Sequence, residues 1–353
     1  MSRAVPVARR SKALSSQVGL TERLFASAED RAAAVAIERG LEEVEAGILR
    51  EVAFADSIAD VATRYLMSAG GKRVRPMLTL LTAQLGGGIT PEVLTAAEAV
   101  EITHLASLYH DDVMDEAEQR RGVPTAQAVW GNSVAILTGD LLFARASSLI
   151  AGLGERAIRL QASTFERLVL GQLHETVGPQ PGDDPIEHYL RVLADKTGSL
   201  IAAAAQLGVI FAGAPREYEE PVLLFGERIG VAFQLVDDVL DLSPSSDETG
   251  KLAGTDLRAG VPTLPLLHLR RQAIEDAVAA ELLGRIEGGI QAAGSPDLAA
   301  AIEELREHEV TAITLAESHR WAASAVEALA PLPDGPVKKA LTRFADVMVE
   351  RSS

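Results

Sequence analysis

Cysteine is absent from the 353 residues, and aromatic residues make up only 4% of them. Without thiols neither disulfide bonds nor thiolate metal sites can form, so any metal ion must be held by oxygen or imidazole ligands. Alternating runs of β-branched residues are scarce as well, so strand signals are weak. These absences exclude a disulfide scaffold and argue against an all-β fold.

Basic residues are in deficit: 33 lysines and arginines face 50 acidic residues, which gives a formal net charge of -17. Non-specific nucleic-acid binding needs an extended basic surface, so we exclude it. The few cations are clustered, because Lys72, Arg73 and Arg75 share one heptapeptide and Arg120 adjoins Arg121. That clustering indicates local binding of small anions.

Long apolar runs are the third absence. We find no signal-peptide stretch in the first twenty residues and no later run of the ~20 apolar residues that a membrane span needs. We therefore expect no transmembrane segment, a cytoplasmic protein, and a disordered N-terminal tail over residues 1–25.

Alanine and leucine recur at helical spacing through most of the chain, and 47% of the residues are hydrophobic. Breaks rich in glycine and proline fall near 70–76, 86–91, 179–185 and 244–260 and separate segments of helix length. No fixed-period repeat or low-complexity linker divides the interior. We predict an all-α fold with one helical domain over residues 26–350.

Two acidic clusters stand out inside apolar segments. On a helix, Asp111 and Asp115 lie one turn apart on the face that also carries His104, and like charges at that spacing repel. Asp237 and Asp241 repeat the DDxxD pattern near residue 240. One copy is typical of any solvated acidic face, whereas two copies within apolar helices favour a cleft lined by carboxylates, which suits Mg²⁺.

The heptapeptide Gly-Gly-Lys-Arg-Val-Arg-Pro at 70–76 combines backbone freedom with alternating cations. Glycines let the backbone approach a ligand closely, and lysine and arginine give charge-assisted contacts to a diphosphate. Taken alone, it also fits a basic surface turn.

With these motifs in view, the chain resembles the trans-isoprenyl (polyprenyl) diphosphate synthase family over nearly its whole length beyond the tail. The matching pieces are GGKRVRP, HLASLYHDDVMDEAEQRRGVPT, Gly139-Asp140, Gly171-Gln172, Lys196-Thr197, FQLVDDVLD, Gly250-Lys251 and DLRAGVPTLP. The resemblance implies a single bundle of antiparallel helices around a deep central cavity, usually as a homodimer. It also implies the condensation of isopentenyl diphosphate with an allylic diphosphate.

The resemblance assigns roles as well. It implies about three Mg²⁺ ions per active site. The implied metal ligands are Asp111, Asp115 and Asp237, supported by Asp112, Asp238 and Asp241. The allylic diphosphate is implied to contact Arg120, Lys196 and Lys251, and isopentenyl diphosphate to contact Lys72, Arg75, His104 and Arg121. Thr197 and Gln234 are implied to lie near the developing carbocation, with Phe233 flanking the isopentenyl group.

The chain departs from the family at Val261, where a lysine often follows the glycine. A cation near the allylic diphosphate is therefore missing from the pattern, although Lys251 remains. We expect reduced affinity at most.

Product length is set in this family by the floor beneath the first aspartate motif. Short-chain members tend to have an aromatic residue four or five positions before the first aspartate, where this chain has Ser107 and Ala106. No aromatic side chain therefore closes the cavity at that level. Each helical turn descends ~5.4 Å, close to the length of one isoprene unit, so opening one turn admits about one more unit. We expect a product of about seven to ten units. Tyr109 should point away from the helix face that carries His104 and Asp111. The alternative is a short-chain product, if a bulky residue among Leu137, Leu141, Leu142 or Phe143 closes the tunnel.

Three other classes of protein share part of this pattern. A class I terpene cyclase shares one aspartate motif but lacks the cationic heptapeptide, and a His-Asp phosphohydrolase leaves residues 233–265 unexplained. A non-catalytic subunit of a heteromeric synthase typically loses an aspartate motif, and both are present here. Activity of the purified single chain separates the last reading from ours.

Overall fold

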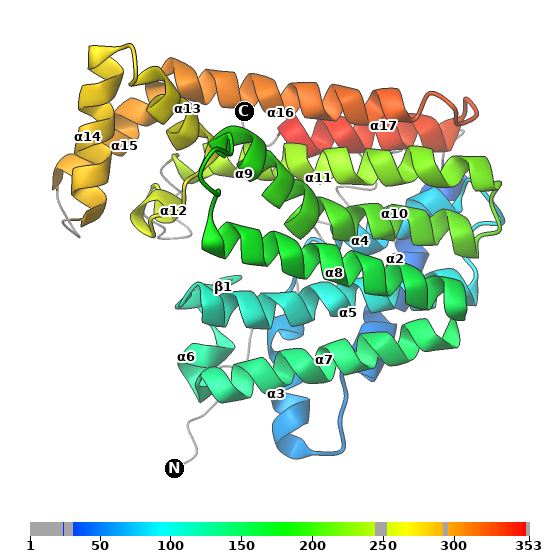
Figure 1. Cartoon of the computed structure of the whole chain (residues 1–353). Helices are drawn as coiled ribbons and strands as arrows, with labels where there is room; N and C mark the ends of the chain where they lie inside the picture. The colour runs from blue at the N-terminus through cyan, green and yellow to red at the C-terminus, as the bar shows by residue number, and fades with distance from the viewer. Residues whose placement is uncertain (1–23, 25–30, 244–252, 292–295, 351–353) are drawn as a thin grey trace. The chain divides into compact units, whose positions relative to one another are not determined.

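The computed structural model describes Leu24 and residues 31–243, 253–291 and 296–350. These residues are almost entirely helical, as Figure 1 shows, so the all-α prediction is confirmed. The elements are α2 (Arg31–Glu51), α3 (Ser57–Ser68), α4 (Val74–Ala83), α5 (Pro91–Met114), β1 (Gln119–Arg120), β2 (Val123–Pro124), α6 (Ala126–Trp130), α7 (Asn132–Gly152), α8 (Glu155–Val177), α9 (Pro185–Leu193), the π-helical turn η2 (Ala194–Gly198), α10 (Ser199–Phe211), the 3₁₀ turn η3 (Arg216–Tyr218), α11 (Glu219–Asp241), α12 (Thr255–Arg258), α13 (Leu264–Gln272), α14 (Ala277–Gln291), α15 (Pro296–Glu307), α16 (Glu309–Ala328) and α17 (Pro336–Val349).

The chain divides into two compact units, each discontinuous in sequence. Unit 1 comprises Met1–Phe165, Leu200–Leu223 and Ala330–Arg343, and unit 2 comprises Glu166–Ser199, Leu224–Leu329 and Phe344–Ser353. The first aspartate motif and the cationic heptapeptide belong to unit 1, whereas the second motif and Lys196 belong to unit 2. The predicted bounds of the helical domain, 26–350, stay a prediction.

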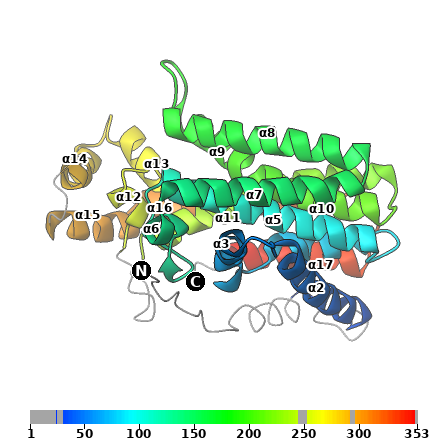
Figure 2. The same cartoon turned by 90° about the horizontal axis from the view of Figure 1, so that it is seen from below.

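Helix α5 is the centre of unit 1 and packs against α2, α4 and α7, which Figures 1 and 2 show beside it. Its alanines and all its valines except Val113 are buried, as expected of a core helix. Gly139 on α7 permits the closest approach, because a Cβ there would lie 2.3 Å from His110 Nε2 and 3.2 Å from the Ala106 carbonyl oxygen. The end of α5 is thereby fixed against α7.

In unit 2, α13 packs against α9, α14 and α16, and α14 packs against α15. A core cluster links these helices to the end of α11; its members include Leu242, Leu257, Leu269, Leu282 and Ile302. The residues after the second aspartate motif are therefore held by a core of their own.

Proline and capping residues begin helices where the sequence predicted breaks. Pro91 is the first residue of α5, after the cap Thr90. Asp184 caps α9 by accepting hydrogen bonds from the amides of Ile186 (2.8 Å) and Glu187 (3.2 Å). Proline tolerates the first helical turn because the amide there lacks an intrahelical partner. The predicted breaks at 86–91 and 179–185 are confirmed.

Of the predicted tail, residues 1–25, only Leu24 lies within the described residues; it is buried, and its carbonyl accepts a hydrogen bond from Arg343 Nη1 at 2.7 Å. The expected absence of a transmembrane segment stays a prediction. Among the described helices, α7 alone is long and apolar enough to cross a membrane by length and composition, with 33% of its apolar window buried.

Candidate active site

The first aspartate motif lies at the C-terminal end of α5. Asp111 is in the last turn and Asp115 caps the helix, with the Asp115 amide donating to the Asp111 carbonyl at 2.8 Å, so the predicted one-turn spacing is realised. Asp111 is partly buried and Asp115 is exposed. The C-terminal end of a helix carries partial negative charge, and no basic residue lies in this last turn. Carboxylates placed there are stabilised by a cation.

Asp112 differs from its neighbours because it is fully buried. Its Oδ1 accepts a hydrogen bond from Arg120 Nε at 2.7 Å. Burial raises the pKa of the Asp112 carboxyl, and the positive charge of Arg120 opposes that shift. The second aspartate of the motif therefore holds an arginine rather than facing solvent.

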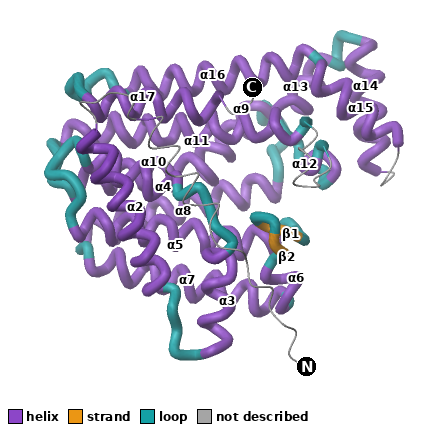
Figure 3. The backbone as a smooth tube through the Cα atoms, turned by 180° about the vertical axis from the view of Figure 1, so that it is seen from behind, coloured by secondary structure: helices purple, strands orange, loops and turns teal. Residues whose placement is uncertain are grey.

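The hairpin β1–β2, orange in Figure 3, carries Arg120 and Arg121. It is anchored at both ends: Thr125 Oγ1 donates to the Ala117 carbonyl at 2.6 Å, and Tyr65 Oη on α3 donates to the Pro124 carbonyl at 2.9 Å. The two adjacent arginines thus stand on a braced turn that directly follows the aspartate motif.

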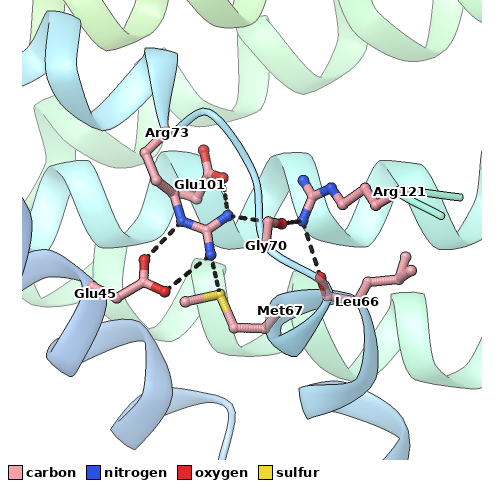
Figure 4. Close-up of polar contacts among 7 residues, drawn as sticks. All are labelled: Glu45, Leu66, Met67, Gly70, Arg73, Glu101 and Arg121. Carbon is pink, nitrogen blue, oxygen red and sulfur yellow. Dashed lines mark hydrogen bonds and ion pairs between the residues drawn. The ribbon is translucent and has the colours of Figure 1, made fainter. Parts of the chain in front are cut away.

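The cationic heptapeptide connects α3 to α4, and Figure 4 shows its contacts. Arg121 Nη1 donates to the Leu66 carbonyl at 3.0 Å and to the Gly70 carbonyl, which Arg73 Nη1 also approaches. The structure therefore brings together two cation clusters that are about fifty residues apart in sequence. Lys72 is exposed and Arg75 is partly buried next to them.

His104 faces this cluster from α5. Its pKa is lowered well below the ordinary histidine value, first by burial and then by the positive charges of Arg75 and Arg121, so the imidazole is neutral at pH 7. Burial lowers the pKa of Arg121 to about 10 and also lowers the pKa of Arg75. Arg75 Nε is buried and has no hydrogen-bond partner among the described residues. So dense a positive cluster is stabilised by a bound anion.

Backbone strain is concentrated at the same place. Among the described residues, the non-glycine residues with positive φ are Arg73 (49°), Glu116 (49°) and Arg121 (54°). Residues with a Cβ pay of order 1–3 kcal/mol for such a conformation, and it persists only where the surroundings fix it. All three flank the aspartate motif or belong to the cation clusters.

The second aspartate motif ends α11 in unit 2, again with no basic residue in the last turn. Asp237 is partly buried. Asp241 caps α12, because its carboxylate accepts hydrogen bonds from the amides of Thr255 (3.1 Å) and Asp256 (3.0 Å). The third aspartate is thus engaged in holding the following segment.

Asp238 is buried, like Asp112 in the first motif. Tyr189 Oη lies 2.9 and 2.8 Å from its two carboxylate oxygens, and the Leu264 amide donates to Oδ2 at 3.1 Å. Burial raises the pKa of Asp238 to about 8 despite these hydrogen bonds. Asp238 therefore ties α11 to α9 and to the start of α13.

Lys196 and Thr197 lie in η2, a π-helical turn that follows α9. Such turns are rare and occur frequently at functional sites. Lys196 Nζ donates to the carboxylate of Glu175, and a Cβ at Gly171 would lie 2.5 Å from the Lys196 amide nitrogen. The glycine at 171 thus permits α8 to support the turn. Phe233 and Gln234, one turn before Asp237, are partly buried on α11.

The positions predicted to form the floor are both buried on α5. Ala106 is fully buried near Gly139, and Ser107, four residues before Asp111, donates a hydrogen bond to the His104 carbonyl at 2.9 Å. Tyr109 points to α3, where its hydroxyl donates to the Ala62 carbonyl and accepts from the Leu66 amide.

Of the bulky α7 residues considered as alternative floors, Leu137 is 61% exposed and Leu141 36% exposed. Phe143 packs on His110 and on Phe165, with ring centroids 5.5 and 4.6 Å apart. Within unit 1, the buried Leu142 and the partly buried Phe143 therefore remain as candidates.

Lys251 lies outside the described residues. Val261, which stands where the family often has lysine, is exposed and lines a largely apolar pocket of about 380 Å³ in unit 2, together with Tyr189, Val192 and Leu267. Position 261 therefore supplies no positive charge, only an apolar side chain.

The carboxylates fit a hard divalent cation that a phosphate helps to bind. Within the described part of the chain, no group of three or more acidic, histidine or cysteine side chains is arranged to hold a metal unaided. Mg²⁺ typically takes one or two protein carboxylates and completes its shell with water and substrate phosphates. Pairs of aspartates at two helix ends match that requirement.

Three residues that position the site were not predicted from the sequence: Arg73, Glu101 and Tyr189. Glu101 is the most recognisable in retrospect, because it is an acidic residue three positions before His104 in a mostly apolar part of the helix. Tyr189 carried no signal, since its partner lies 49 residues away.

Comparisons with known proteins agree with this geometry. The family model described as polyprenyl synthetase matches residues 56–293. The nonaprenyl diphosphate synthase of Mycobacterium tuberculosis is 44% identical over 323 residues, covering 91% of this chain and 95% of that protein.

Two solved structures are similar along most of their length. A decaprenyl diphosphate synthase from Rhodobacter capsulatus is 35% identical with a TM-score of 0.80, covering 92% of this chain and 99% of its own. A geranylgeranyl pyrophosphate synthase from Corynebacterium glutamicum, complexed with calcium and isoprenyl diphosphate, is 41% identical with a TM-score of 0.79, covering 93% and 99%.

Proposed function

This chain belongs to the polyprenyl synthetase family and is a prenyltransferase, and we propose that it extends an allylic diphosphate with isopentenyl diphosphate in a Mg²⁺-dependent reaction. The observation that carries the proposal is the cluster of Arg75, His104 and Arg121 beside the first aspartate motif. A buried guanidinium nitrogen without a partner and a neutral histidine amid arginines favour a bound diphosphate.

In this proposal Lys72, Arg75, His104 and Arg121 bind isopentenyl diphosphate. Neutral His104 donates one hydrogen bond without adding to the repulsion among the arginines. The braced hairpin supports the assignment of Arg121, because its side chain is already tied to the loop that carries Lys72 and Arg75.

The allylic diphosphate is proposed to bind Arg120 and Lys196, with Lys251 from the segment outside the described residues. Asp111, Asp115 and Asp237 are the proposed Mg²⁺ ligands, for about three ions, and Asp112, Asp238 and Asp241 support them. The calcium and isoprenyl diphosphate of the Corynebacterium structure are in keeping with a divalent ion and a diphosphate at such a site.

Breaking the allylic C–O bond leaves a diphosphate anion and a resonance-stabilised cation. Mg²⁺ supplies electrostatic stabilisation of the leaving group when bound, and Arg120 and Lys196 add fixed positive charge. The oxygens of Thr197 and Gln234 stabilise the carbocation, and Phe233 flanks the isopentenyl group. The double bond of isopentenyl diphosphate then attacks C1, and loss of a proton, with the departed diphosphate as base, restores the alkene.

A long product, about seven to ten isoprene units by the length of a helical turn, is our proposal for this chain. The small residues Ser107 and Ala106 below Asp111 support it, as do the nonaprenyl and decaprenyl synthases among its relatives. The geranylgeranyl synthase relative keeps the shorter product as the second candidate.

We further propose a cytoplasmic homodimer. Ile136, Leu137 and Leu141 form an exposed apolar stripe on α7 in unit 1, and α8 exposes Leu170 and Leu173 in unit 2. Exposed apolar surface on neighbouring turns of a helix favours an interface with another chain. A dimer interface over α7 would also account for its apolar composition without a membrane.

Product analysis of the purified chain tests the proposal. The chain is incubated with farnesyl diphosphate, isopentenyl diphosphate and Mg²⁺, and products are separated by chain length, with EDTA and Asp111→Ala as controls. Metal-dependent products of about seven to ten units support the full proposal. A product of four units would overturn the chain-length claim alone, and no elongation from any primer would favour the non-catalytic subunit.

A further inference from the structure

Arg73 is the cation of the heptapeptide that cannot serve as a diphosphate ligand. Its guanidinium has five N–H donors, and five contacts engage them. Nε and Nη2 donate to the two carboxylate oxygens of Glu45 at 2.7 and 3.1 Å, and Nη1 donates to Glu101 at 3.1 Å. The remaining two reach the Gly70 carbonyl at 3.4 Å and Met67 Sδ at 2.8 Å. The side chain is 2% exposed.

These contacts surround the Arg73 guanidinium and hold the loop in place, as Figure 4 shows. Glu45 is on α2, Met67 on α3 and Glu101 on α5, so one guanidinium joins three helices to the loop backbone. The same loop residue adopts a φ of 49°, which an arginine holds only under such constraint. A Cβ at Gly71 would lie 2.4 Å from Arg73 Nη1, so the backbone rests directly on this side chain.

Glu101 is the anion at the centre of the cluster. Its side chain is 2% exposed, and it lies one helical turn before His104 on α5. Besides pairing with Arg73, its negative charge raises the pKa of Arg75 and of Arg121, against the lowering effect of burial. One buried carboxylate therefore serves three arginines, and two of them are proposed substrate ligands.

We infer that Glu101 and Arg73 are positioning residues for isopentenyl diphosphate, which hold the 70–75 loop and the neighbouring guanidinium groups in their receiving arrangement. This inference rests on the proposed function, and it assigns the pair no direct contact with substrate. The Arg73–Glu101 salt bridge thus fixes the positions of the substrate-binding cations. The planar guanidinium of Arg73 donates to two carboxylates at once, which the single ammonium group of a lysine cannot do with the same geometry.

The sign of the effect distinguishes positioning from simple charge balance. If Glu101 merely reduced the positive potential, Glu101→Gln would strengthen anion binding and lower the KM for isopentenyl diphosphate. If Glu101 positions the cluster, the same substitution loosens Arg73, Arg75 and Arg121, and the KM rises. We expect a rise of roughly tenfold, as for the loss of one charge-assisted hydrogen bond.

The experiment measures KM for isopentenyl diphosphate at saturating farnesyl diphosphate, and KM for farnesyl diphosphate at saturating isopentenyl diphosphate. Glu98→Gln is the matched control, because Glu98 is also buried on α5, three residues earlier, and its pKa responds to Arg50 and Glu51 rather than to the cluster. Only Glu101→Gln should raise the first KM, while the second changes less than about twofold.

Arg73→Lys is the second variant, since it keeps the charge and loses the fork. It should raise the same KM by a similar factor, and Glu101→Gln should add little on top of it because the two residues act through one contact. Calorimetric titration with isopentenyl diphosphate alone should show the same loss of affinity, and thermal melting should show that the variants fold.

An unchanged or lowered KM for isopentenyl diphosphate in Glu101→Gln would overturn the inference, as would an equal rise in both KM values. These outcomes require an active wild-type chain. A wild-type protein that neither binds nor elongates isopentenyl diphosphate would instead overturn the proposed function, and this inference with it.

Discussion

The two aspartate motifs share a sequence pattern and a place at the end of a helix, yet their buried second aspartates have different partners. Asp112 in unit 1 is held by Arg120, whose side chain reaches toward the surface. Asp238 in unit 2 is held by Tyr189 and a backbone amide, which are neutral. Asp112 orients a cation that is proposed to bind substrate, whereas Asp238 ties helices α9, α11 and α13 together.

The two motifs also differ in the residue that precedes them by one turn and in the role of their third aspartate. Four residues before its first aspartate, the first motif has Ser107 and the second has Phe233. The third aspartate of the first motif is exposed, whereas Asp241 caps a helix. A DDxxD pattern thus indicates where carboxylates gather, and the neighbours decide what each of them does.

The largest effect should come from the leading aspartates, in which the motifs are alike. Asp111→Ala and Asp237→Ala should each lower kcat by roughly a hundredfold or more, about 3 kcal/mol of transition-state stabilisation. Steady-state assays over a range of Mg²⁺ concentrations measure this loss. Asp241→Ala is the comparison variant; a loss equal to that of Asp237→Ala would place Asp241 among the metal ligands instead of the caps.

Product length should respond to the first motif only. Ser107→Phe puts an aromatic ring on the Asp111 face one turn below the motif, and we expect it to shorten the product by several units, with Ala106→Phe acting at the same level. Reversed-phase separation of the products checks this, with Ser107→Ala as the volume control. A full-length product from both aromatic variants would place the floor on α7, at Leu142 or Phe143.

The contrast between the buried aspartates can be tested by changing one member of each hydrogen-bonded pair, Asp112 with Arg120 and Asp238 with Tyr189. Asp112→Asn releases Arg120 and should raise the KM for the allylic diphosphate by roughly tenfold with a small change in melting temperature. Tyr189→Phe leaves the buried Asp238 short of a donor and should lower the free energy of unfolding by about 1–3 kcal/mol, with a smaller effect on KM.

Urea unfolding and steady-state kinetics on both variants provide the measurement. Tyr218→Phe, in η3 of unit 1, controls for the loss of a tyrosine hydroxyl. A stability loss in Asp112→Asn as large as that in Tyr189→Phe would remove the distinction between an orienting and a scaffolding aspartate.

The smallest effect on catalysis is expected at Glu98, a buried carboxyl outside both motifs. Burial raises its pKa from 4.5 to about 7, so the folded state binds a proton more tightly than the unfolded state does. Its contribution to stability is therefore lost as pH rises from 4.5 through 7. Glu98→Gln should remove this dependence and stabilise the folded state at pH 8, by up to about 3 kcal/mol for a pKa shift of this size, but not at pH 4. Denaturation at both pH values checks it; equal effects at the two pH values would contradict the assignment.

Helical periodicity sufficed to predict the all-α fold and the one-turn spacing of Asp111 and Asp115, because each depends on residues within one or two turns. The partner of Asp238 depends on a contact between α11 and α9, which no local pattern encodes. The resemblance assigned Lys72 and Arg75 of the 70–76 loop to isopentenyl diphosphate and gave Arg73 no role. The internal partners of Arg73 could not be predicted locally, because Glu45 and Glu101 each lie 28 residues from it in the sequence.

The π-helical turn at Lys196 was likewise outside the reach of periodicity, because an extra residue in one turn shifts the register by about 100°. The exposure of Leu137 and Leu141 was missed for another reason: an apolar residue on an apolar helix reads as core, and only the neighbours of α7 show which side is uncovered.

The three left-handed residues set a limit on how far this protein can be made more stable by design. Glu116 is exposed, and glycine or asparagine would relieve its backbone strain while leaving the proposed substrate-binding cations in place. Arg73 and Arg121 offer no such exchange, because the residue that bears the strain also supplies the guanidinium. A selection for heat resistance alone would therefore improve the first position and, if it continued to the other two, erode substrate affinity.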